Sequence, residues 1–424
     1  VAAIGTLWSL SAASAAPTAS SFDSLFAAAA MKPDLLERAV LERNPTLAAA
    51  AAMVAEAKAR ADAAGSLMSP MLDGMVAPRA VGNEDVVAPG YQIGLSQTLP
   101  LFGKRGAERS AAKAEARAAG EDLRSARLDL IQEARTLYYS YFLAARGLEV
   151  NRELVDLLQR FRSIAVEKYA AGTAGQQDAL QADVELAMLD HESIVLARDR
   201  RIVRAKLNAM LHRGPVEELP EPLDSIPDAM EGEELAVAPD VSAMRPDVRR
   251  AVAERDARAA ELSLAEKQRV PDLNLIARYD AMWAEHEMRP TVGAEVSLPF
   301  LFGRVGASQR EARAGLERRE QERLATVDRA RFEIEEALAR VQETRHEIHV
   351  IETRVLPATE RALASIRTAY ESNRTDFNAL LNAERDLARA RLDAQRARVT
   401  YRLALADYER AVARDAGPVA EDPR

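Results

Sequence analysis

The sequence predicts a mainly α-helical protein with a small β part, built as a tandem duplication in which each copy contains a helix, two strands and a long helical hairpin. Three observations predict this class. The 424 residues include only 19 Gly and 19 Pro, aromatic residues make up 5%, and alanine is abundant, which is a helical composition. Sequence landmarks recur about 200 residues apart. No proline occurs between Leu101 and Arg213.

The duplication is visible in phrases that are nearly repeated. "LPLFGKRG" begins at Leu99 and "LPFLFGRVG" begins at Leu298. Other landmarks keep a shift of 199 to 201 residues: Asn44 and Arg245 before a proline, Pro70 and Pro271, Pro100 and Pro299, Tyr169 and Tyr370, Leu180 and Leu381, and Leu186 and Leu387. Because independent landmarks share one register, the chain is predicted to contain two related halves.

Each half is predicted to contain the same elements in the same order. The first repeat, residues 17–213, has helices over 33–64, 104–170 and 176–212 and strands over 66–80 and 90–100. A linker over 214–244 leads to the second repeat, residues 245–415, which has helices over 246–269, 304–371 and 376–414 and strands over 270–283 and 290–300. The tail over 416–424 is predicted to be disordered.

The long helices are predicted to pack as coiled-coil-like hairpins. The sequence Gly172-Thr173-Ala174-Gly175 separates the two helices of the first hairpin, and the helix before it would be roughly 100 Å long. Leu123, Leu130 and Leu137 recur every seven residues, which is the spacing of a coiled-coil seam. In the second hairpin Pro357 is predicted to kink or locally break the helix.

The predicted strands alternate between apolar and polar residues. In "YQIGLSQTLPLF" the side chains of Tyr91, Ile93 and Leu95 alternate with Gln92, Gly94 and Ser96. This pattern suits a barrel wall with a lipid face and a polar lumen, although any half-buried hairpin alternates in the same way. Two hairpins supply four strands, and a membrane barrel needs about eight or more. Closure of such a barrel would therefore require several chains.

Composition excludes several classes of function. The net charge of -9 argues against nucleic acid as a partner, since no basic surface is expected. The absence of cysteine removes disulfides, thiolate catalysis and a lipid-modified cysteine. No catalytic array such as Ser-His-Asp or HExxH occurs in a supporting context, so neither an enzyme nor a cofactor is predicted.

The first residues are predicted to be a targeting segment. Residues 1–16 form an apolar run that ends in small residues, with Ala13-Ser14-Ala15 matching a cleavage pattern. The expected identity is a signal peptide that is truncated or given from a wrong start, and the alternative is a disordered Ala/Ser tail. Elsewhere no uninterrupted apolar stretch of roughly 18 residues occurs.

The duplicated unit with "LP.LFG" between its second strand and long helix resembles the TolC-like outer membrane factors, over roughly residues 31–414. These proteins are exit ducts of tripartite efflux systems. The resemblance implies a homotrimer in which four strands per chain close a twelve-stranded barrel in outer membrane lipid, above a periplasmic α-helical barrel. It also implies a periplasmic adaptor and an inner membrane pump of the RND type as partners, and location in the outer membrane of a Gram-negative bacterium with a periplasmic extension.

Within the family, "GLSQTLPLFGKRG" is most similar to the heavy-metal branch, which serves cobalt-zinc-cadmium or copper-silver export. Heavy-metal cations are therefore the expected cargo. Drugs or solvents are the alternative cargo, because ducts for them share most of the architecture. A soluble periplasmic coiled-coil scaffold is the alternative from another functional class.

The resemblance also implies site residues. The ends of the hairpins, which would contact the adaptor, correspond to Tyr169, Gly172, Thr173, Tyr370, Asn373 and Arg374. The carboxylates that narrow the aperture in the family's type member fall at Ala379 and Asn382, which are not acidic here. Asp178 and Asp376 could supply three-fold charged rings instead and favour cations, or Asp178 could cap its helix.

Other motifs favour simpler interpretations. His346 and His349 lie on one helix face with Glu343, yet such a set is usually solvated surface, and no metal site is predicted there or in the loop with Glu285, His286 and Glu287. Met68, Met71 and Met75 are interpreted as lipid-facing or packing residues rather than copper ligands. "FGKRG" lacks the upstream glycine and the Ser/Thr of a phosphate loop. Lys104 and Arg105 are hypothesised to lie near lipid phosphates.

Overall fold

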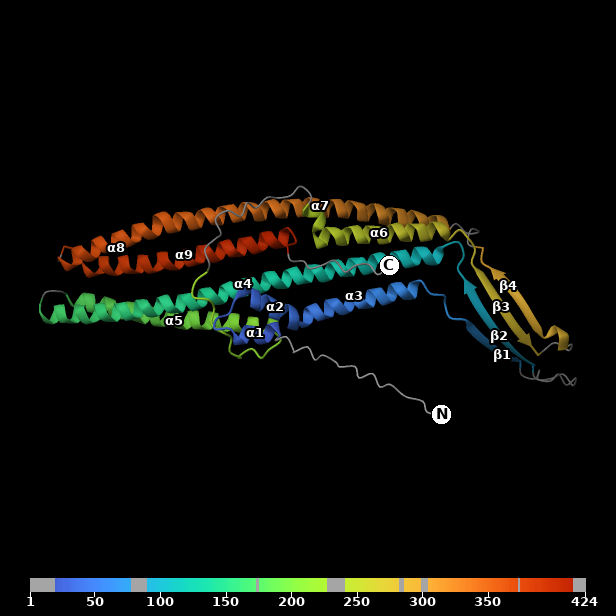
Figure 1. The fold of residues 1–424 in the computed structure, drawn as a ribbon, viewed down its shortest axis with the longest axis horizontal. Coiled ribbons are helices and arrows are strands. Elements are labelled where there is room, and N and C mark those ends of the chain that lie inside the picture. The colour runs from blue at the N-terminus through green and yellow to red at the C-terminus, as the bar shows by residue number, and fades with distance from the viewer. Residues whose placement is uncertain are drawn as a thin grey trace, which may run out of the picture. The chain divides into compact units, whose positions relative to one another are not determined.

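The computed structural model describes residues 20–77, 90–172, 175–226, 241–281, 286–298, 304–372 and 374–414. The helices are α1 (Ser21–Ala27), α2 (Pro33–Arg43), α3 (Pro45–Ala64), α4 (Lys104–Ala170), α5 (Gln176–Met210), η1 (Val241–Met244), α6 (Pro246–Lys267), η2 (His286–Met288), α7 (Arg304–Val350), the π-helical η3 (Ile351–Val355), α8 (Leu356–Glu371) and α9 (Phe377–Ala411). The strands are β1 (Met71–Ala77), β2 (Gly90–Leu99), β3 (Leu273–Asp280) and β4 (Pro290–Val296). Figure 1 shows their arrangement, and the predicted mainly helical class with a small sheet is confirmed.

The chain divides into two compact units. Unit 1 contains the described residues within Val1–Asn44, Glu133–Asp228 and Ile348–Val399, and unit 2 contains those within Pro45–Gln132, Ala229–Glu347 and Thr400–Arg424. Helix α4 runs through both units, as do α7 and α9. Unit 1 therefore holds the ends of both helical hairpins, and unit 2 holds the sheet.

The four strands form one antiparallel sheet in the order β1-β2-β3-β4. Strand β1 pairs with β2 from Met71↔Ser96 to Ala77↔Gly90. The two repeats meet where β2 pairs with β3, from Gln92↔Asp280 to Leu99↔Leu273. In the described part of the sheet, β1 and β4 are the edge strands.

The core of unit 1 lies where α1, α2, α4 and α5 come together. Its fully buried side chains are Leu25, Met31, Leu36, Val40, Tyr138, Tyr141, Phe142, Leu207 and Leu211. The predicted coiled-coil seam of α4 is also largely buried, because Leu130 and Leu137 are 8% exposed. Burial raises the pKa of the Tyr138 hydroxyl to about 12, although a hydrogen bond from the Leu223 backbone lowers it.

Two helices replace the single helix predicted over 33–64. Helix α2 ends at Arg43 and α3 begins at Pro45, because Pro45 has no N–H and forces Asn44 out of the helical region, to φ -70° and ψ 121°. Helix α1 was not predicted. Its signal is Ser20, whose hydroxyl accepts a hydrogen bond from the Asp23 N–H at 3.1 Å.

The long helix predicted over 304–371 is interrupted before Pro357. Residues 351–355 form a π-helical turn in which the Leu356 N–H donates to the Ile351 carbonyl, five residues back. Pro357 cannot donate to the carbonyl four residues before it, and its ring would clash with that carbonyl. The wider turn accommodates the ring, so the predicted local break takes this form.

Two hydrogen bonds whose partners are related by the shift of 201 residues form at the ends of the return helices, α5 and α9, which are the second helices of the two hairpins. Asn44 Nδ2 donates to the Met210 carbonyl at 3.1 Å, and Arg245 Nη1 donates to the Ala411 carbonyl at 3.4 Å. Two residues after each helix end, His212 (φ 54°) after α5 and Ala413 (φ 56°) after α9 adopt the left-handed conformation, which is common just beyond the end of a helix.

The segment after α5 folds back over unit 1. Within the predicted linker 214–244 the structure describes residues 214–226 and 241–244, and Leu219 and Ile226 are buried. The Met31 N–H donates to the Glu221 carbonyl at 2.7 Å. Arg200 pairs with Glu221, so both the backbone and a side-chain charge hold this segment.

We expect Arg245→Ala to lower the free energy of unfolding by about 2–3 kcal/mol, because the buried guanidinium pairs with both Asp247 (2.7 Å) and Glu333 (2.6 Å). The equivalent Asn44→Ala should cost about 1–2 kcal/mol. Heat-induced loss of the helical circular dichroism signal in detergent would measure both. Arg318→Ala, which removes an exposed pair, is the control and should change stability by less than about 0.5 kcal/mol. Equal effects of all three variants would contradict the expectation.

Candidate functional site

The first hairpin ends in a tight turn after α4. Gly172 has φ 71°, a conformation that favours glycine, and its N–H donates to the Tyr169 carbonyl at 2.9 Å. Tyr169 is about half exposed at 49%. Thr173 lies outside the described residues. Gly175 is the N-cap residue of α5. The described part of this hairpin end therefore leaves the aromatic ring of Tyr169 about half exposed to solvent.

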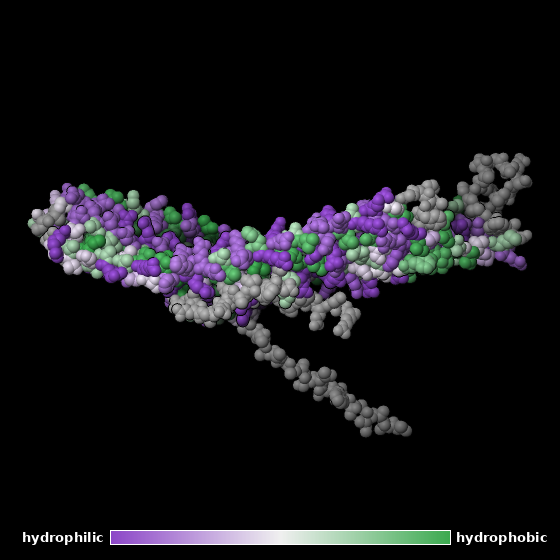
Figure 2. All heavy atoms as spheres, turned by 90° about the horizontal axis from the view of Figure 1, so that it is seen from above, coloured by the Kyte–Doolittle hydropathy of each residue, from purple (hydrophilic) through white to green (hydrophobic). Residues whose placement is uncertain are grey.

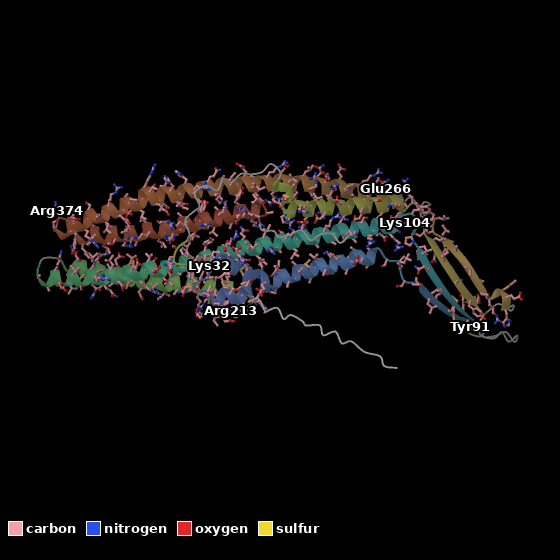
Figure 3. The ribbon with its side chains drawn as sticks, in the orientation of Figure 1. Lys32, Tyr91, Lys104, Arg213, Glu266 and Arg374 are labelled. Carbon is pink, nitrogen blue, oxygen red and sulfur yellow. The ribbon has the colours of Figure 1, made fainter. Side chains whose placement is uncertain are left out.

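The second hairpin ends differently. Arg374 lies at its end (Figure 3), where its N–H donates to the Ala369 carbonyl at 2.8 Å and its Nε donates to Ser372 Oγ at 3.1 Å. Asn373 lies outside the described residues. Tyr370, the equivalent of Tyr169, is only partly exposed and packs edge-on against Phe377 at 6.4 Å. The two equivalent tyrosines therefore have different surroundings.

The aperture candidates occupy the first turns of the return helices. Asp376 Oδ1 accepts a hydrogen bond from the Ala379 N–H at 2.8 Å, which caps α9. Asp178 lies in the first turn of α5, where the helix dipole favours a carboxylate. Asn382 is exposed on α9. The structure places Asp376 just before α9, Asn382 in the second turn of α9, and Asp178 on the other hairpin.

The sequence analysis missed two partly buried charge pairs between the hairpin helices of unit 1. Glu185 on α5 and Arg385 on α9 are 3.1 Å apart, and Glu384 on α9 and Arg367 on α8 are 3.2 Å apart. Both glutamates are 9% exposed. They lie beside an apolar cluster that contains Leu158, Ala182, Phe377, Leu381 and Phe161. Nothing in a single helix pattern marks them, because their partners lie on other helices.

The helix that follows the first sheet hairpin begins with a buried cation. Lys104 is 6% exposed. Its Nζ donates to the Val270 carbonyl at 2.6 Å and to Asp272 Oδ1 at 2.8 Å. Arg105 Nη2 donates to the Gly65 carbonyl at 2.5 Å. The hypothesis that these two cations lie near lipid phosphates is therefore wrong for Lys104, which is labelled in Figure 3. The hydrogen bonds of Lys104 and Arg105 tie the start of α4 to the segments that precede β3 and β1.

The sheet has one apolar face and one polar face. In the paired register the apolar face carries Leu72, Val76, Tyr91, Ile93, Leu95, Leu275, Tyr279, Val292 and Val296, with Gln97 as a polar exception. The polar face carries Asp73, Gln92, Ser96, Thr98, Asn274, Arg278, Asp280, Thr291 and Glu295, with Ile276 as an apolar exception. Charged residues of the described strands all lie on the polar face. In Figure 2 the hydrophobic colour gathers towards the end of the view that holds the strands, where Val292 is 88% exposed.

The register shows which face of the sheet carries two of the methionines. Met71 and Met75 lie on the polar face with Asp73, since residues two apart in a strand share a face. They are therefore not on the apolar face with Leu72 and Val76. Within the described part of the chain, no group of three or more His, Cys, Asp and Glu residues is placed to hold a metal ion.

Among the helices that the structure describes, none combines the length and the apolar composition needed to cross a lipid bilayer.

The model of one protein family, described as outer membrane efflux protein, matches residues 36–212 and 237–414. The chain belongs to the outer membrane efflux protein family. The two matched segments correspond to the two repeats, and as a member of this family the protein is located in the outer membrane of a Gram-negative bacterium.

Three proteins are similar to the chain in sequence, each at 25% identity over part of its length. The chain is 25% identical to fusaric acid resistance protein FusA of Burkholderia cepacia, over 62% of this chain and 54% of FusA. It is 25% identical to outer membrane protein OprJ of Pseudomonas aeruginosa, over 72% of this chain and 66% of OprJ. An uncharacterized protein of Haemophilus influenzae is also 25% identical, over 63% and 59%. The chain thus aligns with about half to two thirds of the length of these relatives.

Solved structures share the fold. CusC superposes with a TM-score of 0.80 at 18% identity, covering 90% of this chain and 91% of CusC. The outer-membrane channel OprN gives 0.79 at 21% identity, with 91% of each chain covered. The CmeC outer membrane channel of Campylobacter jejuni gives 0.79 at 17% identity, with 92% and 87% covered. The resemblance to TolC-like factors is confirmed, as is the duplicated fold of an outer membrane efflux protein.

We expect Gly172→Ala to destabilise the first hairpin by about 1 kcal/mol, because the left-handed conformation penalises a Cβ atom. Gly106→Ala is the matched control. Gly106 lies inside α4 with open space around its Cα, so alanine there should stabilise by up to about 1 kcal/mol. Hydrogen exchange of the amides near 169–172 would measure the first effect. Faster exchange in both variants would contradict the expectation.

We expect Lys104→Ala to lower the free energy of unfolding by about 1.5–3 kcal/mol, because it removes charged hydrogen bonds to Val270 and Asp272. Arg304 occupies the equivalent position in the second repeat and is exposed, so Arg304→Ala is the control and should change stability little. Denaturant midpoints and hydrogen exchange at residues 270–273 would test this difference. Similar values for the two variants would show that Lys104 does not hold the junction.

Proposed function

We propose that the protein is the outer membrane exit duct of a tripartite efflux system and that it conducts its cargo passively. The observation that carries this proposal is the four-stranded sheet, which has one apolar face, one polar face and two edge strands, in a member of the outer membrane efflux protein family. Family membership argues against a soluble periplasmic scaffold. The duct would need no catalytic group, and we assign none.

The sheet supports a homotrimer. Within lipid every backbone N–H and C=O group must be paired, so the edges of β1 and β4 cannot remain open. Four strands are too few to close a membrane barrel, whose minimum is about eight. Three copies supply twelve strands, and each β4 would pair with β1 of the next copy. The apolar face would then contact lipid and the polar face would line the lumen.

The hairpin ends are the proposed contact with a periplasmic adaptor and, through it, an RND-type inner membrane pump. Tyr169 and Arg374 are exposed there. Gly172 gives the first turn its conformation, and Thr173, Tyr370 and Asn373 complete the proposed set. An exposed aromatic ring and a guanidinium are the side chains most enriched in protein interfaces.

The aperture of the duct is proposed to lie at the first turns of α5 and α9. Asp178 would contribute three carboxylates around the axis, and Asp376, which also caps α9, would contribute three more. Asn382 would lie beside them without charge. A ring of carboxylates favours cations over anions, which suits heavy-metal cations as cargo.

A second cargo has its own support. The relative FusA is named for fusaric acid resistance, so a small organic cargo is the alternative. Deleting the gene in its host and measuring growth on graded zinc, cobalt, copper, fusaric acid and hydrophobic antibiotics would separate the two. Sensitivity to metals alone would support the metal cargo, and sensitivity to organic compounds alone would overturn it.

We expect Asp178→Asn to lower the permeability of the duct for potassium relative to chloride, because each trimer loses three negative charges at the aperture. Single-channel recording of the purified protein in planar bilayers would measure the ratio. Asp199→Asn, a partly exposed position further along α5 that pairs with Arg198, is the control and should leave the ratio unchanged. Unaltered selectivity in both variants would remove the assignment of Asp178, whereas absence of any conductance in the unmodified protein would overturn the duct itself.

A further inference from the structure

Basic side chains gather where the helices of unit 2 meet the sheet. The described residues 101–110, 264–272 and 304–310 include seven Lys and Arg residues and three Asp and Glu residues, whereas the whole chain has 57 and 66. Figure 3 labels Lys104 and Glu266 at this junction. The local excess of positive charge is therefore opposite in sign to the net charge of -9.

Hydrogen bonds hold these segments together at one level of unit 2. Lys267 Nζ at the end of α6 donates to the Gly103 carbonyl before α4 at 3.3 Å. Arg269 Nη2 donates to Gln309 Oε1 in the second turn of α7 at 3.0 Å. The cations of this level that do not pair with Asp272 are hereafter the basic collar, whose members are Arg105, Arg109, Lys267, Arg269 and Arg304.

The hydrogen bonds of the basic collar leave its charge in place. Lys267 and Arg105 donate to backbone carbonyls, and Arg269 donates to a neutral amide. Lys104 differs, because it is buried and the Asp272 carboxylate neutralises it. The side chains of Arg269 and of the collar members Arg109 and Arg304 are exposed. The collar is therefore accessible to an anion from outside the chain.

Exposed apolar side chains adjoin the basic collar. Leu67, Phe102 and Leu298 are 47, 72 and 52% exposed. Phe102 follows the end of β2 at Leu99 by three residues, so it lies within about 10 Å of the strand. Its φ of 56° is uncommon for a bulky residue. These side chains extend the apolar surface of the sheet as far as the collar.

We propose that the basic collar binds the phosphate groups of phospholipid headgroups in the leaflet nearest the helices, and that Phe102 inserts at the edge of that leaflet. Lys and Arg form charge-assisted hydrogen bonds with phosphate, and aromatic side chains favour the boundary between hydrocarbon and water. Free phosphate offers the same charge, but the adjoining apolar side chains favour a lipid. The inference rests on the proposed duct and assigns it a lipid-binding site.

Native mass spectrometry of the full-length protein in detergent tests the collar, because it counts the lipid molecules that remain bound. Phosphatidylglycerol is the anionic probe, and phosphatidylcholine is the zwitterionic probe. Lys267→Gln with Arg269→Gln removes two charges and keeps side chains that donate hydrogen bonds. Arg318→Gln with Arg331→Gln is the matched control, since it removes two exposed charges of α7 that lie at least about 20 Å beyond Arg304 along the helix.

We expect the collar variant to bind phosphatidylglycerol at least about fivefold more weakly than the unmodified protein, because each basic side chain near an anionic lipid surface contributes about this factor. The control variant should bind it as the unmodified protein does, and phosphatidylcholine should bind weakly to all three. Helical circular dichroism checks the folding. Arg304→Gln, at an exposed position of the collar, gives a second test if the double variant unfolds.

Three results would overturn the lipid assignment and leave the duct standing. The first is an equal loss of phosphatidylglycerol from the collar variant and the control. The second is displacement of the lipid by inorganic phosphate at constant ionic strength, which would identify a site for free phosphate. The third is a protein that conducts in bilayers without a preference for phosphatidylglycerol. A protein that does not conduct would overturn the duct, on which the lipid site rests.

Phe102→Trp tests whether the ring reaches the leaflet. In vesicles of brominated phospholipid, we expect its fluorescence to be quenched beyond the background from Trp8 and Trp283 of the unmodified protein. Bromine near the headgroup end of the acyl chain should quench more than bromine near the terminal methyl group. Phe332→Trp, at a position of α7 that is 65% exposed, is the control and should show no excess quenching. Equal quenching of both variants would place Phe102 outside the leaflet.

Discussion

The pairing of backbone hydrogen-bonding groups at the edges of the sheet is the constraint on which the proposed assembly depends. Strands β1 and β4 end the described sheet, and lipid offers no hydrogen-bond partners to their free groups. A second copy offers them because it has the same two edges. Pairing of β4 with β1 of a second copy would repeat a contact that the chain already makes, because β2 of the first repeat pairs with β3 of the second repeat within one chain.

The two repeats keep a common backbone and differ in side-chain chemistry. The residue before the helix-starting proline binds the carbonyl of the return helix in both halves, but it is Asn44 in one and the charged Arg245 in the other. Arg245 also joins Asp247 and Glu333. Burial raises the pKa of the Asp247 carboxyl, but the hydrogen bond and charge of Arg245 lower it more, so the pKa lies below its usual value. This stabilisation is complete above about pH 4 and is lost as the pH falls through the lowered pKa.

The same divergence appears at the hairpin ends. Tyr169 is exposed, whereas Tyr370 packs edge-on against Phe377 and has the ammonium group of Lys168 over its ring at 4.3 Å. One tyrosine is thus available to a partner and the other holds two hairpins of unit 1 together. Duplication placed an equivalent tyrosine at the end of each hairpin, and the different packing of the two hairpins gave the two tyrosines different surroundings.

The sequence by itself determined the duplication, the class and order of the elements, and the alternation of the strands, because these depend on composition and on spacing along one chain. It also indicated the break at Pro357. Only the tertiary structure decided the surroundings of Lys104, the face occupied by Met71 and Met75, and the pairing of Glu185 with Arg385. From the sequence alone, a lysine at the start of a helix is expected to be exposed. The fold instead places the Asp272 carboxylate, 168 residues away in the sequence, within hydrogen-bond distance of Lys104. Such contacts depend on which elements become neighbours, and that is a property of the whole fold rather than of any local segment.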